Sequence, residues 1–161
     1  MTCPPPIDPT EHPVIDATIA GQGTAAPYIV FVCKKNGGKS QMAAALMRHE
    51  AGDRVHVASA GTAPGETLNA QSVESLAELG IGVGDEQPKP LTDEMVAAAD
   101  LIVVLGAEAR VEPANGTPVE TWITDEPSER GIGGMERMRL VRDDIAARVR
   151  ELAARFVHGA A

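Results

Sequence analysis

The chain has 161 residues, enough for one domain with a buried core and too few for two domains of ordinary size. It carries 14 Lys and Arg against 23 Asp and Glu, a net charge of -9, so its overall field repels nucleic acids and anionic membranes. Aromatic residues make up only 2% of the chain, and the core therefore has to be built from Ala, Val, Leu, Ile and Met.

The cysteine content excludes two further classes of protein. Cys3 and Cys33 are the only cysteines, and no C-x-x-C or Cys/His ligand spacing occurs, so we expect neither a disulfide scaffold nor a metal site. The N-terminal residues lack the basic and apolar regions of a signal peptide, and no apolar run is long enough to span a membrane. We expect a cytoplasmic protein with neither membrane nor nucleic acid as a partner.

Composition divides the chain into two parts. Five of the 12 prolines fall within the first 13 positions, and each lacks an amide donor and disfavours helix at the preceding residue. Residues 1–26 are therefore predicted to be a disordered, Pro-rich arm. Residues 27–158 are predicted to form the folded domain.

The first predicted elements are two strand-helix units. The unbroken apolar run Tyr28–Cys33 predicts a parallel strand covered on both faces. A glycine-containing loop follows, and Ser40 is placed as the N-cap of a helix that continues to residue 51. A second strand is expected over 55–60 and a second helix over 69–79.

The alternation of strands and helices continues to the end of the chain. Thr92 is expected to cap a short helix, and strands are expected over 101–105 and 119–123. A long amphipathic helix over 135–156 follows. This order predicts an α/β fold: a four-stranded parallel sheet flanked by helices on both faces, in a Rossmann-like three-layer arrangement. In such folds ligands bind beyond the carboxyl ends of the strands.

The loop between the first strand and the first helix is the segment in which chemistry is expected. It combines a cysteine, glycines, lysines and a helix N-terminus, which together form a cradle for an oxyanion. A nucleotide-binding P-loop would require glycine at position 33, where this chain has Cys33. The amides and cations favour the thiolate form of Cys33, so we predict a nucleophile. The alternative is a buried, inert cysteine.

The segment Cys33-x5-Lys39-Ser40 resembles the signature loop of the low-molecular-weight protein tyrosine phosphatases, C-x5-R-S, and of the arsenate reductases built on the same fold. Similarity continues in Ser59-Ala-Gly-Thr62, in Pro88-Lys-Pro-Leu91 and in the acidic segment Trp122–Pro127. The resemblance covers about residues 28 to 157.

The resemblance implies a role for each residue of the loop. Cys33 would be the nucleophile, the Ser40 hydroxyl would donate a hydrogen bond to the thiolate, and Asn36 would hold the shape of the loop. Asp125 or Glu126 would be the general acid, and Asp125 is our first choice because arsenate reductases often carry two acids before this proline. The residues that would wrap the oxyanion are Lys34, Lys35, Asn36, Gly37, Gly38, Lys39 and Ser40.

Two departures from the family pattern shape the expected reaction. Lys39 replaces a bidentate arginine with a point charge, which weakens the grip on a phosphoryl group. No cysteine follows Cys33, so a thiol from outside has to resolve any adduct, unless Cys3 folds back over the loop. The segments 36–44 and 125–130 resemble actinobacterial arsenate reductases that use mycothiol. This implies no tightly bound cofactor, mycothiol as co-substrate and a mycoredoxin-like redox protein as partner.

Three functions follow from these observations. The leading interpretation is arsenate reduction for arsenic detoxification, in which an arseno-cysteine adduct of Cys33 is transferred to mycothiol. The second is hydrolysis of phosphomonoesters through a cysteinyl-phosphate, with phosphate as the bound oxyanion. The third, motivated by Lys39 and the displaced acid, is a catalytically silent module that only binds oxyanions.

Overall fold

The computed structural model describes residues 26–113 and 116–159. Cys3 and nearly all of the predicted arm, residues 1–26, therefore lie outside the described residues. No helix within the described ranges combines the length and the apolar character needed to cross a membrane.

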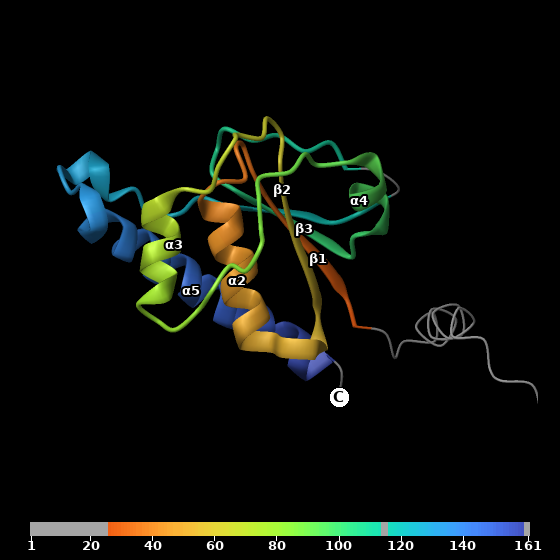
Figure 1. Ribbon diagram of the computed structural model, residues 1–161. Helices are drawn as coiled ribbons and strands as arrows, with labels where there is room; N and C mark the ends of the chain where they lie inside the picture. The colour runs from red at the N-terminus through yellow and green to blue at the C-terminus, as the bar shows by residue number, and fades with distance from the viewer. Residues whose placement is uncertain (1–25, 114–115, 160–161) are drawn as a thin grey trace, which may run out of the picture.

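The four strands of the described residues form one parallel sheet in the order β2-β1-β3-β4 (Figure 1). The chain runs from β1 to β2 on one side and then crosses to β3 on the other side of β1. Doubly wound sheets open a ligand crevice at such a crossing point, beyond the carboxyl ends of the strands. The predicted sheet is confirmed, and its strands are β1 (Tyr28–Cys33), β2 (His56–Gly61), β3 (Leu101–Leu105) and β4 (Val119–Trp122).

The helices cover the two faces of the sheet unequally (Figure 1). The long helices α2 (Lys39–Ala51) and α5 (Gly134–Gly159) pack on one face, with α3 (Ala70–Ala77) beside them. The short helix α4 (Asp93–Ala98) packs on the other face. The expected three layers are thus present. Two single-turn 3-10 helices, η2 (Gly52–Arg54) and η3 (Pro127–Arg130), complete the described elements.

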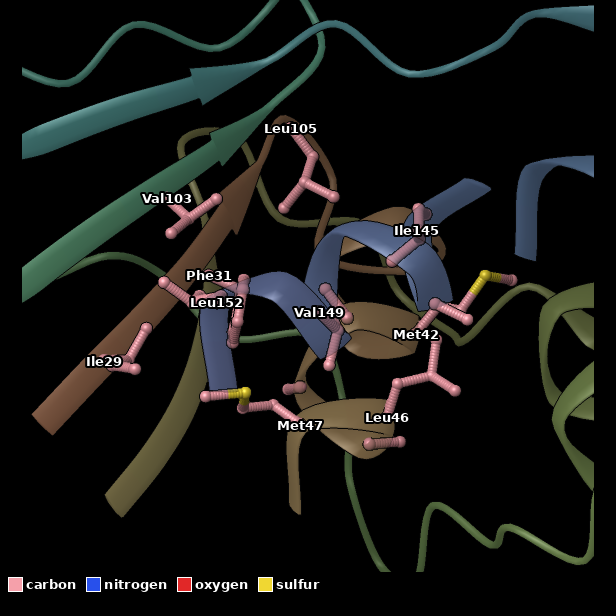
Figure 2. Packing of buried hydrophobic residues seen from close by; sticks show 14 of the residues in the cluster. Ile29, Phe31, Met42, Leu46, Met47, Val103, Leu105, Ile145, Val149 and Leu152 are labelled. Carbon is pink, nitrogen blue, oxygen red and sulfur yellow. The ribbon is translucent and has the colours of Figure 1, made fainter. Parts of the chain in front are cut away.

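The side chains of β1 alternate between the two faces, as those of a doubly covered strand must. Ile29 and Phe31 enter the cluster on the α2 and α5 side, whereas Val30 and Val32 enter the cluster on the α4 side. Each fully buried side chain of this size contributes roughly 1.5–3 kcal/mol. The core therefore fixes the carboxyl end of β1. Figure 2 shows the first cluster, with Ile29, Phe31, Val103 and Leu105 of the strands against Met42, Leu46, Met47, Ile145, Val149 and Leu152.

The sequence predicted the N-cap residue of two helices, and the structure confirms one of these predictions and contradicts the other. The Thr92 hydroxyl accepts a hydrogen bond from Met95 N at 3.1 Å, so the predicted cap of α4 is confirmed. The prediction of Ser40 as the N-cap of α2 is wrong, because Gly38 occupies that position and the helix begins at Lys39. The Ser40 hydroxyl is engaged elsewhere, 2.9 Å from the sulfur of Cys33.

Candidate active site

Cys33 ends β1 and lines a cavity of about 500 Å³. Its side chain is buried and makes no disulfide. The cavity opens beyond the carboxyl ends of three strands, as the parallel sheet predicts. It is lined by Cys33, Lys34, Lys35 and Lys39, by Leu105, Gly106, Ala107 and Glu108 after β3, by Ile123, Thr124, Glu126 and Glu129 after β4, and by Arg137 of α5.

The loop carbonyls are turned away from this cavity by the segment that follows β2. The hydrogen bonds run from Thr62 N to Cys33 O (3.1 Å), from Ala63 N to Lys34 O (2.7 Å), from Gly65 N to Lys35 O (3.0 Å) and from Asn69 N to Gly37 O (2.6 Å). Because the C=O and N–H of a planar trans peptide point in opposite directions, the N–H groups of residues 34, 35, 36 and 38 point away from that segment. Asn36 N shows this direction by donating to Cys33 Sγ at 3.2 Å. The backbone thus presents a set of donors to an anion at the sulfur.

The sulfur of Cys33 accepts hydrogen bonds from two directions. Asn36 Nδ2 donates to Ser40 Oγ at 2.8 Å, which leaves the Ser40 proton free to point at Cys33 Sγ, 2.9 Å away. Asn36 N supplies the second bond, and Asn36 adopts a left-handed φ of 53° that asparagine tolerates better than most residues. The sulfur is therefore held in a fixed position at the end of β1 by hydrogen bonds from the loop that follows it.

The side chain of Asn36 is fully buried and ties the loop to a more distant segment. Its Oδ1 accepts hydrogen bonds from Gln41 Nε2 and from Lys89 N, both at 3.0 Å. Lys89 lies in the Pro88–Leu91 segment that the sequence singled out only by resemblance. Together these bonds fix the amide so that Nδ2 faces Ser40.

The cations of the loop are available to a ligand. Lys34 and Lys35 are exposed, and Lys39 is half-buried in the first turn of α2. Within residues 26–113 and 116–159, none of these three ammonium groups forms an ion pair with a carboxylate. Gly37 and Gly38 contribute backbone only and border a smaller neighbouring cavity.

The structure separates the two predicted acids. The carboxylate of Asp125 binds Arg130 at 2.8 and 3.0 Å, which lowers the pKa of Asp125, and this side chain is not part of the cavity lining. Glu126 lines the cavity, but its carboxylate binds Arg137 at 2.7 and 2.8 Å. The bonds from Arg137 lower the pKa of Glu126 to about 2. Both side chains are therefore hydrogen-bond acceptors in this arrangement.

Sequence reasoning missed four polar residues of the cavity: Glu108, Thr124, Glu129 and Arg137. Glu108 follows β3 and Thr124 follows β4, so the rule that ligands bind at the carboxyl ends of parallel strands could have indicated them. Arg137 lies in the first turns of α5, and no local signal connects it with the loop of Cys33.

The fold is a parallel sheet between two layers of helices. Its inner strand β1 ends in a cysteine that lies beside lysines and inward-facing amides, and this combination is typical of phosphatase-type sites. The profile of the family described as low molecular weight phosphotyrosine protein phosphatase matches residues 28–120. The chain belongs to this family.

Similar proteins are named as arsenate reductases. An arsenate reductase of Brevibacillus brevis is 33% identical over 128 residues, which cover 78% of this chain and 92% of that protein. A putative arsenate reductase of Halobacterium salinarum is 29% identical over 131 residues, which cover 78% of this chain and 90% of that protein. Among solved structures, a thioredoxin-dependent arsenate reductase of Corynebacterium glutamicum has a TM-score of 0.73 at 28% identity, covering 93% of this chain and 72% of that one.

Proposed function

We propose that this protein reduces arsenate, and that Cys33 forms an arseno-cysteine adduct which a low-molecular-weight thiol from outside the chain resolves. The observation that carries the proposal is the sulfur of Cys33, held by Ser40 and Asn36 in a cavity with inward-facing amides and three lysines that form no ion pair within the described residues. The similarity to proteins named arsenate reductases supports arsenate as the oxyanion.

The first step needs no proton from the protein. The Cys33 thiolate attacks the arsenic of the arsenate monoanion, an S–As bond forms, and one As–O bond breaks. The departing hydroxyl takes the second proton of the same anion and leaves as water. The loop amides and Lys39 stabilise the charge on the remaining oxygens, which is where preorganised donors have their largest effect.

We assign the second step to an external thiol, because no cysteine follows Cys33 in the sequence and Cys3 is the only other one. A small thiolate attacks arsenic, the Cys33–As bond breaks, and Cys33 is restored as thiolate. A redox protein thiol then attacks the sulfur of this conjugate, so arsenic gains two electrons and leaves as arsenite while a mixed disulfide forms. We propose that mycothiol is the small thiol and that a mycoredoxin-like protein is the redox protein. The cavity of about 500 Å³ has room for a co-substrate beside a five-atom oxyanion.

The test supplies arsenate with one complete reducing system at a time: mycothiol with mycoredoxin, glutathione with glutaredoxin, or thioredoxin with its reductase. Arsenite formation is measured in each case. If only the mycothiol system supports turnover, both parts of the proposal are supported. If the thioredoxin system supports turnover, arsenate reduction is supported but the proposal that mycothiol is the reducing thiol is wrong. The Cys3→Ser variant should retain turnover. A loss of turnover in that variant would assign resolution to Cys3.

Phosphomonoester hydrolysis remains the second candidate, because the chain belongs to a phosphatase family and the same sulfur serves both reactions. Two features oppose it. Lys39 stands where a bidentate arginine would grip the phosphoryl group, and no aromatic residue lines the cavity in the part of the chain that the structure describes. Hydrolysis of p-nitrophenyl phosphate without thiol at about 1 per second or faster would favour the phosphatase. Anion binding without either turnover would favour the silent module.

Lys39→Arg is expected to raise kcat/KM for phosphate esters by about tenfold. A guanidinium adds a second charge-assisted hydrogen bond to the transition state, and one such bond is worth about 1.5–3 kcal/mol. The measurement is hydrolysis of p-nitrophenyl phosphate by variant and wild type. An unchanged rate would contradict the assigned role of Lys39 in the loop.

Thr124→Val is expected to raise KM for arsenate by about tenfold or more without lowering Tm. The Thr124 hydroxyl is buried, lines the cavity and has no hydrogen-bond partner among the described residues, so it is available to the oxyanion. Losing a bond to a charged group has an effect of this size. Thr117→Val is the matched control, because the Thr117 hydroxyl donates to Val96 O at 3.0 Å, so this change should lower Tm and leave KM unaltered.

A further inference from the structure

The carboxylate of Glu126 is fully engaged as an acceptor. Its Oε1 accepts from Arg137 at 2.7 Å, and its Oε2 accepts from Arg137 Nε at 2.8 Å and from Ser128 Oγ at 2.8 Å. The same Oε2 receives Ser128 N at 3.4 Å, so Glu126 also caps η3. Each of these bonds favours the ionised carboxyl. They agree with the pKa of about 2 given above, for which Arg137 is the largest cause.

This ion pair borders the same cavity as Cys33. Glu126 is the residue directly before Pro127, the place at which the family resemblance puts a proton donor. Its competitor Asp125 is bound by Arg130 and does not line the cavity. Among the described residues, the other charged side chains that line the cavity are Lys34, Lys35, Lys39, Glu108 and Glu129.

The two candidate substrates differ in their need for a proton donor. An aryl phosphate dianion carries no proton, so the thiolate can expel a phenolate of pKa about 10 readily only if an acid delivers a proton to the ester oxygen. In that step the S–P bond forms, the P–O bond breaks, and the carboxyl proton passes to the leaving oxygen. The arsenate monoanion brings the proton for its own departing water.

We propose that the Glu126–Arg137 ion pair determines substrate specificity: it withholds the proton that an ester oxygen needs and restricts the Cys33 site to arsenate-like substrates whose leaving group is water. The inference rests on the proposed function and adds a reason for its selectivity. Arg137 acts through Glu126, as a positioning residue.

The expected size of the effect follows from the protonated fraction of Glu126. At neutral pH, a rise from the pKa of about 2 to the ordinary glutamate value of about 4.3 increases that fraction by about 200-fold. A positioned general acid contributes about 10²–10⁴-fold to such a reaction. Freeing Glu126 should therefore raise ester hydrolysis measurably even though most of the carboxyl stays ionised.

The test is Arg137→Gln, assayed without thiol on phosphotyrosine and on p-nitrophenyl phosphate. At pH 7 about 0.2% of the freed carboxyl is protonated, and an acid worth up to about 10⁴-fold then gives a gain of at most about 20-fold. We expect kcat/KM for phosphotyrosine to rise by about fivefold to 20-fold, and that for p-nitrophenyl phosphate by less than about threefold, because p-nitrophenolate leaves without a proton. In the double variant Arg137→Gln, Glu126→Gln the gain should disappear. Arg139→Gln is the matched control, because Arg139 lies on the same helix, binds Glu78 in the same bidentate way and does not line the cavity.

The outcomes separate this inference from the proposed function. No gain on phosphotyrosine, an equal gain on both esters, or a gain that survives Glu126→Gln would each overturn it. Arsenate reduction by the wild type, measured in the same preparations, tests the proposed function independently. If Arg137→Gln fails to fold, Arg137→Lys breaks the bidentate geometry but keeps the charge, and a smaller gain confined to phosphotyrosine is expected.

Discussion

Replacing Cys33 with serine is expected to lower arsenate turnover by on the order of 10⁴-fold or more, because the nucleophile is lost. Anion binding should persist, since the loop amides and the lysines are untouched and the neutral hydroxyl repels an oxyanion less than a thiolate does. Turnover is measured by arsenite formation, and binding by titration calorimetry with arsenate and phosphate.

Alkylation checks the same assignment in the wild type. Iodoacetamide should modify Cys33 faster than free cysteine, and arsenate should protect it, because the bound anion covers the sulfur. Full turnover in the Cys33→Ser variant, or a sulfur that reacts slowly and is not protected by arsenate, would remove the enzymatic interpretation.

Gly61→Ala should reduce arsenate turnover by about 10²-fold, the cost typical of a displacement near 1 Å in a reacting geometry. Gly61 ends β2, and a Cβ at this position would lie 2.7 Å from Lys34 O and 3.0 Å from Asn36 Cβ. Because Lys34 O is a backbone atom, a Cβ only 2.7 Å from it would force the backbone of the loop to shift. The displaced loop would no longer direct its amides at the anion, while the sheet core beneath remains intact.

Gly65→Ala is the matched control for this prediction. A Cβ there would meet only Lys35 atoms, at 3.8 and 3.9 Å, which is ordinary contact. The variant should keep turnover within about twofold, because the Gly65 N–H still binds Lys35 O. Equal rates for the two variants would show that the approach of β2 to the loop does not matter. Thermal unfolding of both variants confirms that each is folded.

Local signals predicted the fold because they agree along most of the chain. The run Tyr28–Cys33 predicts a strand covered on both faces, and the structure confirms such a strand: Tyr28 is half-buried and the five residues after it are buried. Thr92 caps α4, as predicted from its hydroxyl and from the two acidic residues that follow it. The prediction failed at Ser40, where a good capping residue instead bonds the sulfur of Cys33, because the anion loop itself leads into the helix.

The contiguous part of the site could also be predicted from the sequence. Cys33, the three lysines and the helix start at Lys39 are neighbours in the chain, so local geometry alone brings them together. The segment that turns the loop carbonyls outward could not be recognised in the same way. Its partners are more than 25 residues away, and only the pairing of β2 with β1 brings Gly61 against the loop.

By itself, therefore, the sequence determined a parallel α/β sheet and a cysteine in a glycine- and lysine-containing loop at the start of a helix, since both depend on periodicity and on residues next to one another. Only the tertiary structure decided which groups share the cavity and in what ionised state. Arg137 reaches Glu126 from a different element, and the charge of a carboxyl depends on the cation that folding places beside it.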